Sequence, residues 1–204
     1  MYSNTEVISL TSSKKPDKYY AILEGAMKVF AENGFHKSQV SRIAKEAGVA
    51  DGTIYLYFKK KEDILTSLFQ EKLGELVEKF NAAVRESTSP KDALRKICEI
   101  HFSELENNIH MAYLTQIELR QSDLELRKEI GLALKRYIIL IENILEKGKN
   151  DGSFRADLDV KLVRLLIFGG MDEVVTSWLI SGQKYSLTAQ VGPTLDFFIK
   201  GMGS

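Results

Sequence analysis

The sequence is poor in the residues that hold a fold together by disulfides or by β-strands. It contains a single cysteine, Cys98, which excludes an intramolecular disulfide and fits a reducing compartment. Only three prolines interrupt the 204 residues, and the alternation of apolar and polar residues that is typical of strands is absent. The predicted fold class is therefore all-α.

Long apolar runs and enzyme motifs are missing as well. No uninterrupted apolar run approaches the roughly 20 residues that span a bilayer, and the N-terminus lacks the apolar core of a secretory signal. We therefore expect a cytoplasmic protein without membrane contact. The sequence has no nucleophile elbow, Gly-rich phosphate loop or paired His and carboxylate motif. His36, His101 and His110 lack the spacing of metal ligands, so we expect no enzyme, metal or cofactor.

Charged residues are plentiful but unevenly distributed. The chain has 28 Lys and Arg and 28 Asp and Glu. Residues 14–61 contain ten Lys and Arg against five Asp and Glu, a net charge of +5, whereas residues 62–204 have a net charge of −4. This distribution is typical of a phosphate-binding head on an acidic body.

The basic segment contains a predicted helix-turn-helix over residues 38–61. Ser38 is expected to cap the first helix, and Gly48 is expected to form the turn because glycine enters the left-handed region without strain. The second helix is predicted over about residues 50–57, with its first residues reaching base edges in the major groove. Lys59 to Lys61 follow it, where they would lie beside phosphates.

The chain divides into three predicted parts: a tail over residues 1–16, a DNA-binding head over 17–61 and a body over 62–204. A helix over residues 17–33 completes the three-helix head, and the tail is either plain disorder or an arm that reaches DNA through Lys14 and Lys15. The body is predicted to have about six helices. They are expected over about 62–84, 90–107, 109–121, 122–150, 158–181 and 185–202, with Ser89 and Asp157 as helix caps.

Three stretches of the head resemble the TetR family of bacterial transcriptional repressors: Ala26–Phe35, Ile43–Val49 and Gly52–Leu65. Residues 49–58, 115–127 and 167–178 are similar to a narrower group in that family, the repressors of fatty-acid degradation. The resemblance implies that long-chain acyl-CoA is the inducer and releases the repressor from operators ahead of β-oxidation genes. The alternatives are a TetR-type regulator of efflux or another pathway with a different apolar inducer, and a helical carrier of lipid or acyl-CoA.

The resemblance also implies a homodimer that reads palindromic double-stranded DNA. The last two helices are apolar on more than one face, which indicates that something besides the protein's own core covers them. We expect that cover to be the second copy, in a four-helix interface.

The DNA contacts that the resemblance implies lie in and around the helix-turn-helix. Thr53 and Tyr55 would contact phosphate or base edges, Tyr57 the backbone, and Lys61 a phosphate, so that Lys61→Ala weakens binding to every DNA sequence. Packing within the head is the alternative for the two tyrosines. The predicted DNA-contacting residues are Ser38, Gln39, Ser41, Gly52, Thr53, Tyr55, Tyr57, Lys59 and Lys61.

An acyl-CoA ligand requires an apolar tunnel for the chain and cations for the phosphates, and the planar fork of Arg suits phosphate best. Arg120, Arg127 and Arg164 are candidate cations, with Lys128 and Lys135 less favoured, and Arg127 is also placed to pair with Asp123. The predicted ligand-binding residues, most of which core packing would equally explain, are Phe102, Leu105, Tyr113, Gln116, Ile117, Arg120, Arg127, Phe168, Gly169, Met171, Val175 and Trp178.

Two further features of the segment over residues 158–181 are unusual. Gly169 and Gly170 inside an apolar helix cost about 1 kcal/mol each relative to alanine, which indicates close approach by a ligand or a partner helix. Asp172 is expected either to accept a hydrogen bond from a buried Arg or to face solvent.

Overall fold

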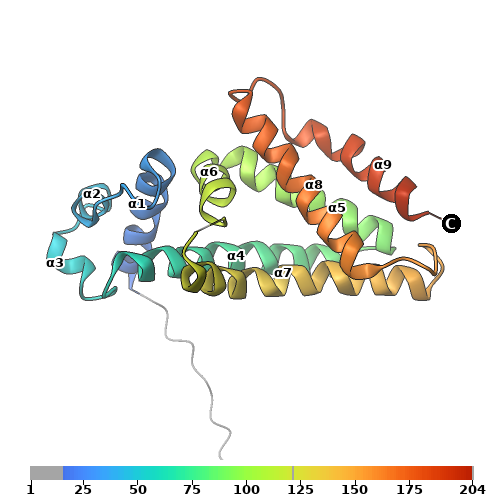
Figure 1. The fold of residues 1–204 in the computed structure, drawn as a ribbon, viewed down its shortest axis with the longest axis horizontal. Coiled ribbons are helices and arrows are strands. Elements are labelled where there is room, and N and C mark those ends of the chain that lie inside the picture. The colour runs from blue at the N-terminus through green and yellow to red at the C-terminus, as the bar shows by residue number, and fades with distance from the viewer. Residues whose placement is uncertain (1–15, 121, 204) are drawn as a thin grey trace, which may run out of the picture.

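The computed structural model describes residues 16–120 and 122–203. Within these ranges the chain forms nine α-helices and one short 3-10 helix, with no strand, so the predicted all-α class is confirmed. Figure 1 shows a small helical head at one end of an elongated body. Lys14 and Lys15 lie outside the described residues. No helix in the described part of the chain has the length and apolarity to cross a membrane.

The head consists of α1 (Asp17–Asn33), α2 (Val40–Glu46) and α3 (Asp51–Ile54). The two glycines that follow α1 and α2 adopt the left-handed conformation that their sequence predicts, with φ of 73° at Gly34 and 67° at Gly48. The side chains that fill the space between the three helices are all buried: Ile22, Phe30, Phe35, Ile43, Ile54 and Phe58.

Two details of the head differ from the prediction. Ser38 does not cap α2, since its hydroxyl donates to the carbonyls of Val29 and Gly34 at 3.2 and 2.7 Å and thereby closes the loop between α1 and α2. The third helix is also shorter than the predicted 50–57. Its last turn tightens, with the Tyr57 N–H bonding to the Ile54 carbonyl, and the following residue, Phe58, turns into the core.

The body contains six helices, the predicted number. The bounds of these helices are α4 (Lys61–Arg85), α5 (Pro90–Asn107), α6 (Ile109–Glu118), α7 (Leu124–Asn150), α8 (Val160–Ile180) and α9 (Val191–Met202). Ser89 caps α5 as predicted, its hydroxyl accepting the Asp92 N–H at 3.1 Å. Asp157 does not cap α8, because the helix begins two residues later than predicted and Asp159 takes that role.

The last predicted helix, over residues 185–202, is divided. A 3-10 turn over Thr188–Gln190 precedes α9, and the segment before it is held by side chains of the body rather than by its own helix. The Trp178 indole N–H donates to the Tyr185 carbonyl at 2.8 Å, and the Glu106 carboxylate accepts the Leu187 N–H at 2.6 Å. These tertiary bonds replace the helical turn.

The helices of the body surround a central space. In Figure 1, α4 and α7 run side by side along the length of the body, α5 and α8 cross above them, and α9 lies on the outer side of α8. The short helix α6 lies between the body and α1 of the head. The head is therefore joined to the body by α4 through the chain and by α6 through packing.

Two glycines of α7 provide a matched test of packing. Gly148 is buried, and a Cβ atom there would overlap the Phe154 ring, whereas Gly131 has open space around it. We expect Gly148→Ala to lower the free energy of unfolding by about 1–3 kcal/mol through overpacking. Gly131→Ala should raise it by up to about 1 kcal/mol through helix propensity. Urea unfolding measures both, and equal effects of the two substitutions would refute this account of the α7 end.

Candidate functional site

The outer surface of the head contains most of the predicted DNA contacts. Gln39, Ser41, Gly52 and Lys59 are exposed and Thr53 is half-buried. Tyr55, just after α3, has 58% of its surface exposed. These residues are free to contact a ligand outside the head, and Figure 1 places α2 and α3 at the end of the molecule farthest from the body.

One residue that the sequence analysis missed shares this surface. Leu56 is 81% exposed, which is unusual for an aliphatic side chain in a small domain. Lys60, which was expected beside phosphates with its two neighbours, is exposed as well. An exposed leucine beside a helix-turn-helix is a candidate for apolar contact with the methyl group of thymine. The signal was present in the sequence, because Leu56 lies between two residues that were assigned to the outside.

Two other predicted contacts have partners inside the head. Tyr57 is half-buried, and its ring centroid lies 6.3 Å from that of Tyr19 and 6.4 Å from that of Phe58. Ser38 is buried by the bonds that close the loop. The structure thus gives both residues a packing role.

Lys61, the first residue of α4, is also turned inward. Its ammonium group donates to the carbonyls of Phe35, His36 and Ser38 at 2.7, 3.1 and 3.1 Å, and it lies 4.5 Å from the centroid of the Phe35 ring. All three ammonium protons are used in this way. In this arrangement Lys61 fixes the turn between α1 and α2, and the exposed lysines at 59 and 60 are better placed for DNA.

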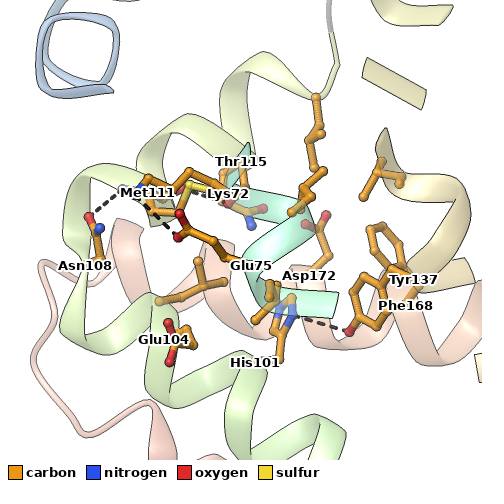
Figure 2. Close-up of a pocket in the computed structure, with 16 residues that line it drawn as sticks. Lys72, Glu75, His101, Glu104, Asn108, Met111, Thr115, Tyr137, Phe168 and Asp172 are labelled. Atoms are coloured by element: carbon orange, nitrogen blue, oxygen red, sulfur yellow. Dashed lines mark hydrogen bonds and ion pairs between the residues drawn. The ribbon is translucent and has the colours of Figure 1, made fainter. Parts of the chain in front are cut away.

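The body encloses a cavity of about 130 Å³ between five helices, α4 to α8. Figure 2 shows that its lining side chains come from all of these helices. The lining residues are Lys72, Leu73, Glu75, Leu76, His101, Glu104, Leu105, Asn108, Met111, Thr115, Gln116, Leu119, Leu134, Tyr137, Phe168 and Asp172.

The cavity includes three of the predicted ligand-binding residues, Leu105, Gln116 and Phe168. The other nine lie elsewhere in the body. Tyr113 is half-buried in α6, while Ile117, Arg120, Arg127 and Gly169 are exposed. The remaining four are packed in the core behind the lining residues: Phe102, Met171, Val175 and Trp178.

One end of the cavity is polar, and sequence reasoning did not find it. His101 is only 9% exposed, and its Nδ1 lies 3.3 Å from the Tyr137 hydroxyl. Burial lowers the pKa of His101 to about 4, against a smaller opposing effect of Asp172, so the imidazole is neutral at pH 7. Burial likewise raises the pKa of the Tyr137 hydroxyl. Figure 2 shows His101, Tyr137 and Asp172 gathered at this end.

Asp172 forms an ion pair with Arg120 across the gap between α8 and α6. This confirms the first of the two alternatives for Asp172, except that the arginine is mostly exposed rather than buried. A second polar bond joins the same helices, since the Thr176 hydroxyl donates to the Gln116 side-chain oxygen at 2.6 Å. Helix α6 is thus tied to α8 beside the cavity.

The other candidate cations are less favourably placed. Arg164 is bonded to Glu142 at 3.1 Å, while Lys128 and Lys135 are exposed on α7. Asp123 accepts the Leu126 N–H as the cap of α7, so its carboxylate already has a partner within the helix start. Arg127 is exposed in the first turn of that helix, close in sequence to Arg120.

Helix α6 also touches the head. Its last residue, Glu118, is buried, and its carboxylate accepts the Phe35 N–H at 2.8 Å. The carbonyl of Phe35 is one of those that Lys61 holds. The residue that begins the turn before α2 is therefore bonded to both α6 and α4, and both helices line the cavity.

An apolar face is exposed on α8 and α9. Leu165 is 56% and Phe197 is 76% exposed, and a groove of about 640 Å³ runs between these helices. A Cβ atom on Gly170 would lie 2.8 Å from the Phe198 ring, so this glycine permits close packing of α9, as its position in an apolar helix indicated. Gly169 has open space around it in the groove.

Comparison with protein families and relatives gives a coherent result. Residues 22–68 match the family described as bacterial regulatory proteins of the tetR family, and residues 69–201 match the C-terminal region of YsiA-like proteins. The chain is 48% identical to the fatty acid metabolism regulator protein of Bacillus subtilis, over 93% of this chain and 97% of the relative. It is 30% identical to the transcriptional repressor KstR2 of Mycolicibacterium smegmatis, over 75% of each chain.

Solved structures show the same similarity. The fatty acid degradation regulator FadR of Bacillus halodurans superposes with a TM-score of 0.90 at 48% identity, covering 93% of this chain and 98% of that one. FadR of Bacillus subtilis, solved in complex with stearoyl-CoA, superposes with a TM-score of 0.88 at 48% identity, covering 90% of this chain and 99% of that one.

The positions of the lysines lead to a test that separates folding from DNA contact. Lys61→Met removes the donor of three carbonyls and should lower the free energy of unfolding by about 1–3 kcal/mol. Lys59→Met should leave stability within about 0.5 kcal/mol. It should also make the slope of log affinity against log salt less steep by about one. Urea unfolding and DNA binding at several salt concentrations give these values.

The opposite pattern would restore the first interpretation of Lys61. If Lys61→Met is as stable as the parent and itself removes about one unit of the salt slope, its ammonium contacts phosphate and the bonds to the head carbonyls are incidental.

Proposed function

This chain belongs to the TetR family of bacterial regulators, and from that premise we propose that it represses fatty-acid degradation genes and is released from operator DNA by long-chain acyl-CoA. The proposal is supported by the relative that regulates fatty acid metabolism and by the related structure that holds stearoyl-CoA. The protein would act in the cytoplasm as a regulator and not as an enzyme.

The cavity enclosed by α4 to α8 is the observation that carries this proposal. Its volume of about 130 Å³ is smaller than the roughly 300–1,000 Å³ of sites that hold drug-sized ligands. A long acyl chain therefore requires the surrounding helices to move apart. A ligand that fits only the widened body shifts the equilibrium between the closed and widened states. The size of the shift is set by the difference between the ligand's affinities for these two states.

Helix α6 is the element through which widening would reach the head. It supplies Met111, Thr115 and Gln116 to the cavity wall, and its last residue, Glu118, holds the turn before α2. An acyl chain that displaces α6 would move this turn. The relative position of the two α3 helices in the dimer, and therefore their fit to the operator, would change.

The phosphates of CoA would bind near the C-terminal end of α6. The lysines of α4 on this side of the body are already neutralised, because Lys72 pairs with Glu24 at 2.5 Å and Lys79 with Glu104 at 2.7 Å. Arg120 is also paired, with Asp172, but 57% of its side chain is exposed. Together with the exposed Arg127 at the start of α7, it offers the planar donors that phosphate favours.

The operator would be read by the exposed residues of α2, α3 and the segment that follows. We propose that Tyr55 and Leu56 reach base edges and that Lys59 and Lys60 contact phosphates. Gln39, Ser41, Gly52 and Thr53 complete the contact surface. Two heads in a symmetric dimer match a palindromic site with half-sites about one helical turn apart or somewhat more.

The dimer would form through the exposed apolar face of α8 and α9. A face of this kind on adjacent helices is suited to a second copy that buries it in a four-helix interface. Helix α6 forms part of the cavity wall and is bonded to α8. A movement of the cavity wall in one protomer would therefore also move the α8 face against which the other protomer packs.

Release by ligand is tested directly on a DNA-bound sample. Fluorescence anisotropy of labelled palindromic operator DNA should fall when acyl-CoA of about 16–18 carbons is added, because the widened body no longer supports the DNA-binding arrangement. Short-chain acyl-CoA and free CoA are the controls and should leave the complex intact. No release by any long-chain acyl-CoA would contradict the proposed inducer, while specific binding to the palindrome would preserve the repressor.

A charge placed in the proposed dimer face tests the assembly. We expect Leu165→Arg to convert the dimer into a monomer, because an arginine at a buried interface costs several times the roughly 1.5–3 kcal/mol that a leucine contributes there. Leu132→Arg on α7, an equally exposed leucine, should leave the dimer unchanged. Sedimentation velocity distinguishes the two species, and a Leu165→Arg protein that sediments as the parent does would exclude this face.

A further inference from the structure

The polar end of the cavity contains a hydrogen-bonding atom with no partner. Among the buried side-chain nitrogen and oxygen atoms of the described residues, His101 Nε2 alone lacks one. Leaving such an atom unbonded in the interior is unfavourable, and each instance calls for an explanation. His101 lines the cavity, but Nε2 itself is buried, so a ligand reaches this atom only when the surrounding helices move apart as the proposed function requires.

The neighbouring tyrosine determines which proton His101 carries. A tyrosine hydroxyl has one proton, and the Tyr137 hydroxyl lies 3.3 Å from His101 Nδ1. When that proton is donated to Nδ1, the neutral imidazole carries its own proton on Nε2. The opposite assignment leaves the buried tyrosine proton without this acceptor. The network therefore assigns Nε2–H as a hydrogen-bond donor.

The other polar groups near this end already have partners. The Asp172 carboxylate is bonded to Arg120, and the Thr115 hydroxyl donates to the Met111 and Ala112 carbonyls of its own helix at 3.0 Å. Most of the remaining wall is apolar. Its apolar members are Leu73, Leu76, Leu105, Met111, Leu119, Leu134 and Phe168. Lys72, Asn108 and Gln116 carry further donors in the lining. Nε2–H is thus the unpartnered buried donor at the His101 end of the cavity.

We propose that His101 donates its Nε2–H to an oxygen atom of the acyl group that fills the cavity, with Tyr137 as the positioning residue that fixes the tautomer. This inference rests on the proposed function and adds a selection rule to it: the site prefers an acyl group with an oxygen at this depth over a hydrocarbon chain of the same length. The oxygen belongs either to the thioester carbonyl or to a hydroxyl group near it on the chain.

The test compares three CoA derivatives of one chain length by calorimetry on the full chain without DNA. They are the acyl thioester, the S-alkyl thioether that lacks the carbonyl, and the 3-hydroxyacyl thioester. The variants are His101→Leu, which removes the donor, and His101→Gln, whose amide restores one. Ile97→Val is the matched control, since Ile97 is buried in the same helix but does not line the cavity.

We expect His101→Leu to bind the preferred oxygen-bearing ligand about tenfold more weakly and to bind the thioether as the parent does. Its thermal midpoint should stay close to that of the parent, because the substitution removes the unpartnered Nε2 but also takes away the partner of the buried Tyr137 hydroxyl. His101→Gln should recover part of the lost affinity. Tyr137→Phe should reduce the preference less than His101→Leu, because the donor remains but its tautomer is free.

Each outcome of this test decides a separate point. Loss of the preference for thioester over thioether in His101→Leu identifies the carbonyl as the acceptor, and loss of the preference for the 3-hydroxyacyl ligand identifies the chain hydroxyl. If His101→Leu retains both preferences while still binding acyl-CoA, the role of His101 is overturned and the proposed function stands. If the parent binds no acyl-CoA, the proposed function fails and this inference fails with it.

Discussion

The hydrogen bond between the Glu118 carboxylate and the Phe35 N–H is the contact on which the rest of the structure depends. It is buried, it spans 83 residues of sequence, and it joins the last residue of α6 to the turn that positions α2. The same turn is fixed from its other side by the Lys61 ammonium at the start of α4. A buried carboxylate and a partly buried ammonium thus hold one short backbone segment, which makes the position of the head sensitive to both helices.

The polar bonds of the body extend this arrangement away from the head. Arg120 and Gln116 tie α6 to Asp172 and Thr176 of α8, and α8 carries the apolar face proposed for the dimer. Under the proposed function, a ligand between these helices would act on the turn before α2 and on the proposed dimer surface at the same time. Linkage requires the reverse as well, so a protein held on its operator must bind the ligand more weakly.

Local chemistry predicted much of the fold. Gly34 and Gly48 end their helices because the backbone there is left-handed. Ser89 before Pro90 starts α5. These signals were readable because each acts within a few residues of sequence. The failures have tertiary causes. Ser38 was expected to cap a helix but bonds to carbonyls of the preceding turn, and the segment after Tyr185 is held by Trp178 and Glu106.

The candidate site was less predictable, because five helices meet to form it. The sequence predicted most of the exposed residues on the outer surface of the head. It did not predict the inward position of Lys61, because the partners of Lys61 lie 23 to 26 residues away. Leu105, Gln116 and Phe168 were predicted as ligand-binding residues and line the cavity. His101 and Tyr137 come from separate helices, and their pairing has no sequence signal. The Arg120 to Asp172 bond was anticipated only as one of two alternatives.

The central claim is that α6 transmits the state of the cavity to the head through Glu118, and one measurement tests it most directly. Operator affinity is determined with and without saturating long-chain acyl-CoA for the parent, for Glu118→Ala and for Glu129→Ala, a control at an exposed glutamate of α7. The account predicts that Glu118→Ala still binds acyl-CoA but that the ratio of the two operator affinities falls toward one, while the control keeps the parent ratio. A Glu118→Ala protein with the full parent ratio would contradict it.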